Sequence, residues 1–145
     1  MLSDVLRRVL GRFDRTVFGG APVAAHLPMA HAKLPSAPVP TEWVRAGSPS
    51  ASALELTRSP DGGLVTGVWE CTPGSFRWYF ASDEVVVILS GKGRVRIGDA
   101  EHALAPGVSV YFPVGTDSEW TIEQTLRKHF THRFPTPLLQ RALQR

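Results

Sequence analysis

Cysteine is nearly missing from this chain of 145 residues, which has Cys71 alone. A single thiol cannot form an internal disulfide, and such sparing use of cysteine is typical of a reducing compartment. Long apolar runs are missing too: none approaches the ~20 residues of a membrane-spanning helix. The N-terminus also lacks the continuous apolar block of a secretory signal. We therefore expect a cytoplasmic protein with no membrane span.

Acidic residues are lacking at one end of the chain. Residues 127–145 carry four Arg and one Lys without an acid (+5), and residues 1–20 carry four Arg and two Asp (+2). Because the net charge is +3, the section between them carries −4. The basic character belongs to the two ends, where solvated charge is the simplest explanation. No helix-turn-helix pattern occurs, so DNA binding ranks last among the functions considered, and we predict no nucleic-acid partner.

The first 20 residues are typical of an amphipathic helix. Apolar residues recur there at helical spacing, opposite four arginines, and Gly19-Gly20 ends the pattern. We favour a helix docked on its own domain or on a partner subunit. A membrane-surface helix is an alternative, and a mitochondrial presequence is disfavoured by Asp4 and Asp14. The apolar residues are Leu2, Val5, Leu6, Val9, Leu10, Phe13 and Val17.

Two further segments flank the centre of the chain. Residues 21–52 contain six prolines and many Ala and Ser, which predicts an extended arm that crosses the outside of the domain. Residues 135–145 predict a short C-terminal helix that begins at Thr136-Pro137. Its apolar face suits the mouth of a barrel or a dimer contact.

Residues 53–134 predict an all-β domain, because apolar residues recur there with a period of two between turn signals. Asp61-Gly62-Gly63, Ser90–Gly93, Gly98-Asp99 and Pro106-Gly107 are the expected turns, the last of type II. Eight or nine short strands at regular spacing are typical of a sandwich or barrel.

Two motifs resemble those of the cupin superfamily. Gly107, Pro113 and Gly115 reproduce its Gly-x5-Pro-x-Gly pattern, and Glu84 with Gly91 matches its Glu-x6-Gly pattern. The likeness covers about residues 40–134 and is strongest to the ethanolamine-utilisation and ureidoglycine aminohydrolase group. It implies a double-stranded β-helix, or jelly-roll barrel, which the N-terminal and C-terminal helices predicted above would flank. Cupin domains commonly pair, so we also expect a homodimer.

The resemblance also implies where a metal would be held. Metal-binding cupins supply ligands at positions that correspond to Trp78, Phe80, Glu84 and Ser118, of which only Glu84 is a good ligand. We therefore predict no metal and no other cofactor. The alternative is that His102, His129 or His132 rebuilds a metal site.

Strand parity predicts what replaces the metal. Trp120, Lys128 and His132 share one face of the last strand region, and Trp78 shares a face with Phe80. If these faces point inward, Lys128 enters an aromatic interior beside Glu84. We predict a ligand pocket formed by Trp78, Tyr79, Phe80, Glu84, Trp120 and Lys128. The alternative is that Lys128 reaches solvent and the aromatic residues are core.

Two functions remain after this reasoning, and the sequence does not decide whether the protein is an enzyme. The first is a metal-free cupin that binds a small polar molecule. The second is a hydrolase or isomerase, either metal-assisted or using Lys128 and Glu84 as acid and base. Cys71 is expected to be buried and not a nucleophile.

Overall fold

The computed structural model describes Ala24, Met29 and residues 33–134. The helices predicted over 1–20 and 135–145, and much of the predicted arm, lie outside the described residues. The described part is almost entirely antiparallel β-sheet, which confirms the all-β prediction. None of its helices is long and apolar enough to cross a membrane.

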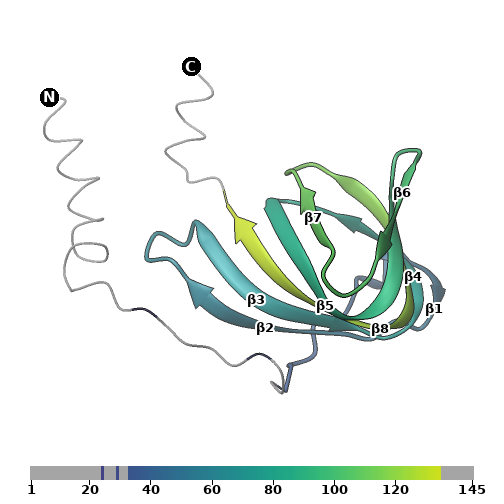
Figure 1. Ribbon diagram of the computed structural model, residues 1–145, viewed down its shortest axis with the longest axis horizontal. Coiled ribbons are helices and arrows are strands. Elements are labelled where there is room, and N and C mark those ends of the chain that lie inside the picture. Colours follow the sequence, from purple (N-terminus) through teal and green to yellow (C-terminus); the bar gives the residue numbers. More distant parts are fainter. Residues whose placement is uncertain (1–23, 25–28, 30–32, 135–145) are drawn as a thin grey trace, which may run out of the picture.

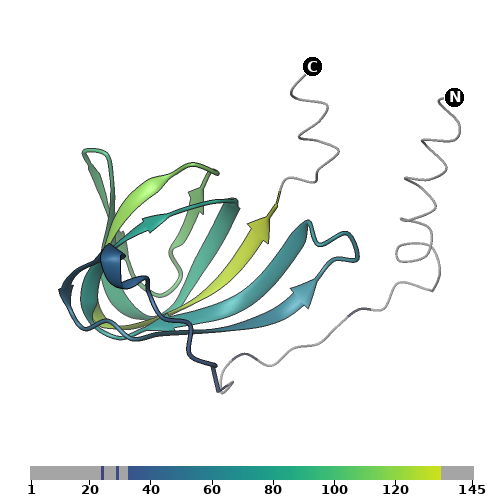
Figure 2. The same cartoon turned by 180° about the vertical axis from the view of Figure 1, so that it is seen from behind.

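Eight strands form one strongly curved sheet (Figures 1 and 2). A 3₁₀ turn, Thr41–Trp43, precedes the first strand. The strands are β1 Val44–Gly47, β2 Ala51–Arg58, β3 Leu64–Cys71, β4 Gly74–Tyr79, β5 Asp83–Ile97, β6 Ala100–Leu104, β7 Ser109–Phe112 and β8 Asp117–Arg133.

The longest strand, β8, organises the sheet. Its first half pairs with β4 and with the second half of β5, and its second half pairs with β3 and with the first half of β5. Strand β5 also pairs with β7 near its start and with β6 near its end. Residues from the two halves of the barrel are thus brought together along β8.

The turn predicted at Ser90–Gly93 is wrong, because β5 runs through it as one strand. Its register against β8 shifts between Ile88 and Gly93, which marks a bulge. Gly91 has φ 90°, and a Cβ there would lie 2.1 Å from the carbonyl oxygen of Thr125. Glycine therefore serves a close crossing of two long strands and not a chain reversal. The Pro106-Gly107 turn is confirmed: Gly107 has φ 89°, and Val108 donates to the Ala105 carbonyl.

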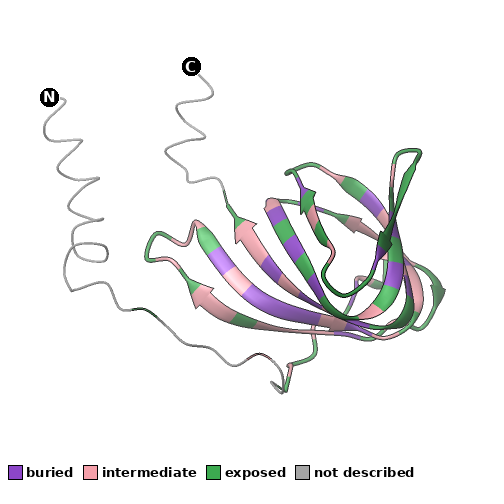
Figure 3. Ribbon diagram, in the orientation of Figure 1, coloured by how far each residue is buried: buried purple, intermediate pink, exposed green. Residues whose placement is uncertain are grey.

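Alternation along the strands builds the core, as the banding of β5 in Figure 3 shows. On β8 the residues with even numbers, apart from the exposed Gln124, face inward, including Trp120, Leu126 and Lys128, so the predicted parity is confirmed. On β5, Glu84, Val86 and Ile88 are buried while the residues between them are exposed. The interior is therefore aromatic and aliphatic, with few polar groups.

The end of the proline-rich arm lies along strand β2. Ala37 donates its N–H to the Ala51 carbonyl, Ala53 donates to the Pro35 carbonyl, and Ser36 forms a bridge with Ser52. An extended segment on a sheet edge satisfies backbone groups that would otherwise be open to pairing. The sheet itself begins before residue 53, because β1 and the first residues of β2 belong to it.

Candidate functional site

The centre of the candidate site is an ion pair inside the barrel. Glu84 is the second residue of β5 and Lys128 lies near the end of β8, and both side chains are more than nine-tenths buried. The Lys128 ammonium donates to Glu84 Oε1 over 3.1 Å. Burial of one charge without the other costs several kcal/mol, so the two strands bring each side chain its necessary partner.

Two tryptophans flank the ammonium of Lys128. Its Nζ lies 4.9 Å from the ring centroid of Trp69 and 4.9 Å from that of Trp120. Trp69 faces Lys128 directly across the β3–β8 ladder, so strand register sets this contact. The electron-rich faces of indole rings attract a cation, and this attraction strengthens where water is excluded. The rings therefore hold Lys128 in place without giving its N–H groups strong acceptors.

His132 extends the pair toward the end of the barrel. Its Nδ1 lies 2.8 Å from the hydroxyl of the buried Ser82 and 3.5 Å from Glu84 Oε2. Burial lowers the pKa of His132 below its usual value of 6.5, against the opposing charge of Glu84, and the charge of Lys128 lowers it further. The imidazole is thus neutral at pH 7, and its contact with Glu84 is not an ion pair. Ser82, His132, Glu84 and Lys128 form a continuous polar chain.

His132, Glu84 and Lys128 line a cavity of about 330 Å³. Its wall is mostly apolar, and the arm closes one side with Ala37 and Pro38. This volume falls within the range of small-molecule sites, which combine apolar walls with a few polar groups. The lining residues are Ala37, Pro38, Ala53, Trp69, Phe76, Trp78, Glu84, Trp120, Lys128, Phe130 and His132.

The predicted pocket is assembled in part. Trp78, Glu84, Trp120 and Lys128 all line the cavity. The structure places Tyr79 outside it, with 42% of its surface exposed, because alternation turns its side chain away from Trp78.

Phe80 is buried but does not line the cavity. It stacks on Phe112, with ring centroids 4.2 Å apart, in another part of the core. The strand β4 ends at Tyr79, so parity within that strand does not govern the side chain that follows it.

Sequence reasoning missed several of the lining residues. Trp69 alternates with other inward residues of β3, so parity on that strand would have found it. Parity would also have predicted Phe76 as a lining residue, since it shares a face of β4 with Trp78. Pro38 carries no comparable signal, because only the folded chain brings the arm to the cavity wall. The same holds for Ser82, which does not line the cavity but contacts His132.

The donor set does not fit a metal centre of the cupin type. Among the described residues no cluster of three or more His, Cys, Asp or Glu side chains is placed to hold an ion. His102 is exposed on β6, and His129 points to the outer face of β8, away from Lys128. Only His132 approaches Glu84, and that carboxylate already binds an ammonium.

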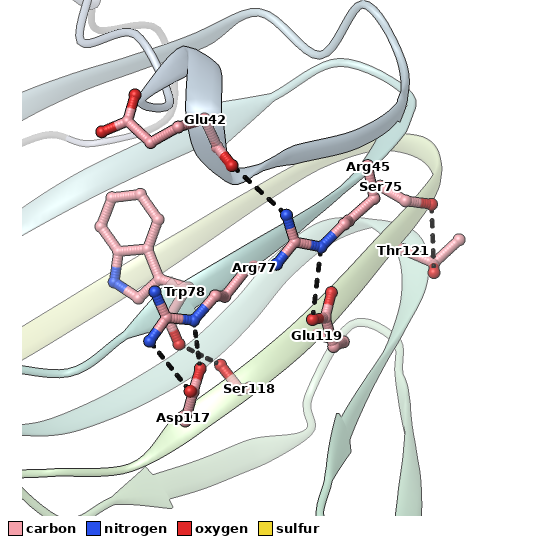
Figure 4. A network of polar contacts seen from close by, with 9 residues as sticks. All are labelled: Glu42, Arg45, Ser75, Arg77, Trp78, Asp117, Ser118, Glu119 and Thr121. Carbon is pink, nitrogen blue, oxygen red and sulfur yellow. Dashed lines mark hydrogen bonds and ion pairs between the residues drawn. The ribbon is translucent and has the colours of Figure 1, made fainter.

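Ser118, at the remaining ligand position, has a structural role. Its hydroxyl donates to the carbonyl oxygen of Trp78 over 2.8 Å, as Figure 4 shows, and accepts from Trp120 Nε1 over 3.0 Å. One hydroxyl thus orients two of the cavity's tryptophans. A histidine at this place would lose both bonds.

Cys71 is fully buried at the end of β3, as expected. Burial raises the pKa of its thiol to about 11, although the nearby charge of Lys128 opposes this. The thiol donates weakly to the Thr72 carbonyl over 3.4 Å. A thiol that stays protonated near neutral pH is a poor nucleophile, so Cys71 is a packing residue.

A jelly-roll sheet with one cavity wall built from β3, β4, β5 and β8 defines a cupin-type barrel. The sequence model of the EutQ-like cupin domain matches residues 58–130, half of the chain. The chain therefore belongs to the EutQ-like cupin family. No curated protein sequence is similar enough to count as a match.

Solved structures agree with this fold. The chain is 18% identical to ethanolamine utilization protein Q of Salmonella typhimurium, over 58% of this chain and 69% of that one, with a TM-score of 0.53. The chain is 17% identical to the EutQ protein of Clostridium difficile, over 62% of this chain and 71% of that one, with a TM-score of 0.54.

A protein of unknown function from the DUF861 family of Pseudomonas syringae is also similar. It is 19% identical, covers 70% of this chain and 44% of its own, and has a TM-score of 0.64. Likeness at such low identity establishes the fold alone, since this fold carries many functions.

Proposed function

We propose that this cupin binds a small, largely apolar molecule in the barrel cavity, with a polar head group against Lys128 and Glu84. The cavity's volume of about 330 Å³ and its aromatic wall support a ligand of this kind. The function does not require a metal, because the groups that would contact the ligand are organic side chains. It rests on one observation, which concerns the hydrogen bonds of Lys128.

An ammonium group has three N–H donors. Within the described part of the chain, Lys128 makes one hydrogen bond, to Glu84 Oε1. The indole faces of Trp69 and Trp120 attract the charge but are weak acceptors. A buried donor without an acceptor is costly, so a carbonyl, carboxylate or hydroxyl oxygen of a ligand would be stabilised at this ammonium.

Ligand-induced stabilisation tests the proposal. The full chain is heated with a panel of small carbonyl compounds, alcohols and carboxylates on apolar bodies. A ligand raises the free energy of unfolding by RT ln(1 + [L]/Kd). We expect at least one compound to raise the melting temperature of the wild type and not that of the double variant Lys128→Met/Glu84→Gln.

The double variant removes both charges, so neither remains buried without a partner. Arg96→Gln is the matched control, because Arg96 is exposed on the outer face of β5 and leaves the cavity intact. The proposal fails if no compound stabilises the wild type. It also fails if the double variant responds to the same compounds as strongly as the wild type does.

A second candidate is an acid–base enzyme that uses Lys128 and Glu84. The observation in its favour is His132, a neutral imidazole on the cavity wall that contacts both Glu84 and Ser82. A neutral imidazole can accept a proton from a bound molecule. We expect His132→Gln to keep ligand binding and to abolish turnover of a bound compound. Binding by the wild type without any turnover would retire this candidate.

The cytoplasmic location expected from cysteine usage stays a prediction. Fractionation of cells that express the full chain at its natural level would test it.

A further inference from the structure

A second hollow lies on the outer face of the barrel, over β1, β4, β8 and the second half of β5. It has a volume of about 430 Å³, and three arginines line it: Arg45 of β1 with Arg94 and Arg96 of β5. Residues 21–126 carry seven basic residues against eleven acidic ones. Three of those seven at one hollow are therefore an unusual local concentration of positive charge. We call this hollow the outer groove.

Two short hydroxyl side chains form the floor of the outer groove. Thr121 of β8 is paired with Ser75 of β4 on one side and with Arg94 of β5 on the other. Ser75 Oγ donates to Thr121 Oγ1 over 3.4 Å, as Figure 4 shows. Because Thr121 accepts this bond, its own hydroxyl hydrogen is available to a ligand oxygen. The short side chains keep the floor below the arginines on either side and supply it with a donor.

Arg96 differs from the other two arginines in its partners. The sheet register sets it between two carboxylates, Glu101 of β6 and Glu119 of β8. Glu101 nevertheless pairs with Arg94, at 3.7 Å. Glu119 pairs with Arg45, at 3.6 Å, which Figure 4 also shows. Among the residues that the structure describes, the guanidinium of Arg96 has no ion pair or hydrogen bond. Its five N–H donors are therefore available to a ligand.

We propose that the outer groove binds the phosphate group of a small phosphate monoester. Arg94 and Arg96 would donate to it from the side of β5, Arg45 from the side of β1, and Thr121 from the floor. The planar fork of a guanidinium matches two phosphate oxygens at once. Donors on two sides and below suit the three terminal oxygens of a tetrahedral phosphate monoester, whereas a planar carboxylate offers only two oxygens. The sheet separates the outer groove from the barrel cavity, so this proposal goes beyond the proposed function and does not depend on it.

The acidic residues of the outer groove favour a hydroxylated body on the ligand. The lining contains three arginines and two glutamates, Glu101 and Glu119, and has a net charge of +1. The two carboxylates are acceptors for hydroxyl groups and would repel a second anionic group. The volume of about 430 Å³ leaves room for such a body beside the phosphate group.

Titration of the full chain with glycerol 3-phosphate, at constant ionic strength and followed by the NMR signals of the backbone amides, tests the proposal. We expect saturable shifts at Ser75, at Thr121 and over residues 94–96. The amides of Lys128 and His132, which belong to the cavity, should not shift. Glycerol should cause no shifts, because it lacks the charge. Inorganic phosphate should shift the same amides with a higher dissociation constant, because it lacks the hydroxylated body.

Variants of Arg96 test the part assigned to its guanidinium. Arg96→Gln should raise the dissociation constant for glycerol 3-phosphate about 10-fold or more, because it removes charge-assisted hydrogen bonds to the phosphate. Arg96→Lys keeps the charge without the planar fork and should give an intermediate value. Arg58→Gln is the matched control, because Arg58 is an exposed arginine of β2 that pairs with Glu55 outside the outer groove. It should leave the dissociation constant unchanged.

Four results would overturn the proposal. The first is a wild type without saturable shifts, and the second is a set of shifts centred on Lys128 and His132, which would place the ligand in the cavity. The third is an Arg96→Gln variant that binds as tightly as Arg58→Gln does. The fourth is binding of inorganic phosphate as tight as that of glycerol 3-phosphate, which would mean an adventitious ion only. The amide spectra also report folding, and Arg96 is exposed on the outer face of β5, so each variant should keep the fold.

Discussion

Strand β8 carries charged side chains on both faces, and the two faces use them differently. On the inner face a single ammonium, Lys128, is buried against Glu84 between two indole rings. On the outer face the acids of β8 form ion pairs with arginines of β1, β4 and β5, part of which Figure 4 shows. The outer pairs are Arg45–Glu119, Arg77–Asp117 and Arg94–Glu123.

The difference lies in access to water. When an outer arginine loses its acidic partner, water solvates its guanidinium group. Such an ion pair therefore adds little to the free energy of unfolding. Lys128 that loses Glu84 remains buried between two indole rings, with little access to solvent. Outer pairs therefore help to hold neighbouring strands together, while the inner pair forms the charged centre of the cavity. Three changes should sharpen this contrast, from the largest effect to the smallest.

Breaking the inner pair should have the largest effect. We expect Glu84→Gln and Lys128→Met, each alone, to lower the free energy of unfolding by about 3–5 kcal/mol, because each leaves its partner buried and unbalanced. The double variant should recover most of that loss. Urea unfolding followed by tryptophan fluorescence measures all four proteins of the cycle. Additive losses in the double variant would show that the two groups do not stabilise each other.

Lowering the pH should have an intermediate effect through His132. Burial lowers its pKa in the folded chain, so the unfolded chain binds a proton first as the pH falls through 6.5. Stability is therefore complete above pH 6.5 and declines below it, until the pH reaches the lowered pKa of the folded state. The paired acids of the outer face, such as Asp117, titrate below their usual value of 3.8 and do not contribute in this window.

Melting temperatures between pH 7.5 and 5.5 measure this effect, and His132→Gln should reduce the dependence. The pKa of His129 is also lowered by burial, so the variant should keep part of it. An unchanged pH dependence in His132→Gln would show that His132 is solvated in the folded protein.

Breaking an outer pair should have the smallest effect. We expect Arg94→Ala to lower the free energy of unfolding by about 0.2–1 kcal/mol, because Arg94 and Glu123 are both partly hydrated. Raising the salt concentration should shrink the difference further, since exposed charges are screened. Urea unfolding at low and high salt checks this. If Arg94→Ala lowered the free energy of unfolding as much as Lys128→Met does, the outer and inner ion pairs would not differ in their contribution to stability.

Much of the fold could be predicted from local pattern. Alternation on β8 placed Trp120 and Lys128 inward, because a strand's period of two is set by the backbone alone. The turn at Pro106-Gly107 followed from the φ angles that these two residues favour. Local pattern failed at Gly91, where close contact between two strands requires a glycine. The sequence cannot distinguish such a glycine from one that is required by a turn.

The candidate site was predictable only where parity and motif agreed. Glu84 came from its motif and Lys128 from parity, and the structure brings them to 3.1 Å. Phe80 was placed by parity with Trp78, which does not hold because β4 ends at Tyr79. Tyr79 has the opposite parity to Trp78, and its side chain is exposed outside the cavity.

The sequence by itself determined the strands, the period that separates their two faces and the residue types at Trp78, Phe80 and Ser118. These properties depend on residue type and on neighbours along the chain. Only the tertiary structure decided that Trp69 and Trp120 enclose Lys128, that His132 reaches Glu84, and that Pro38 closes the cavity. Those contacts depend on the register of strands far apart in sequence, which is set by packing of the whole sheet.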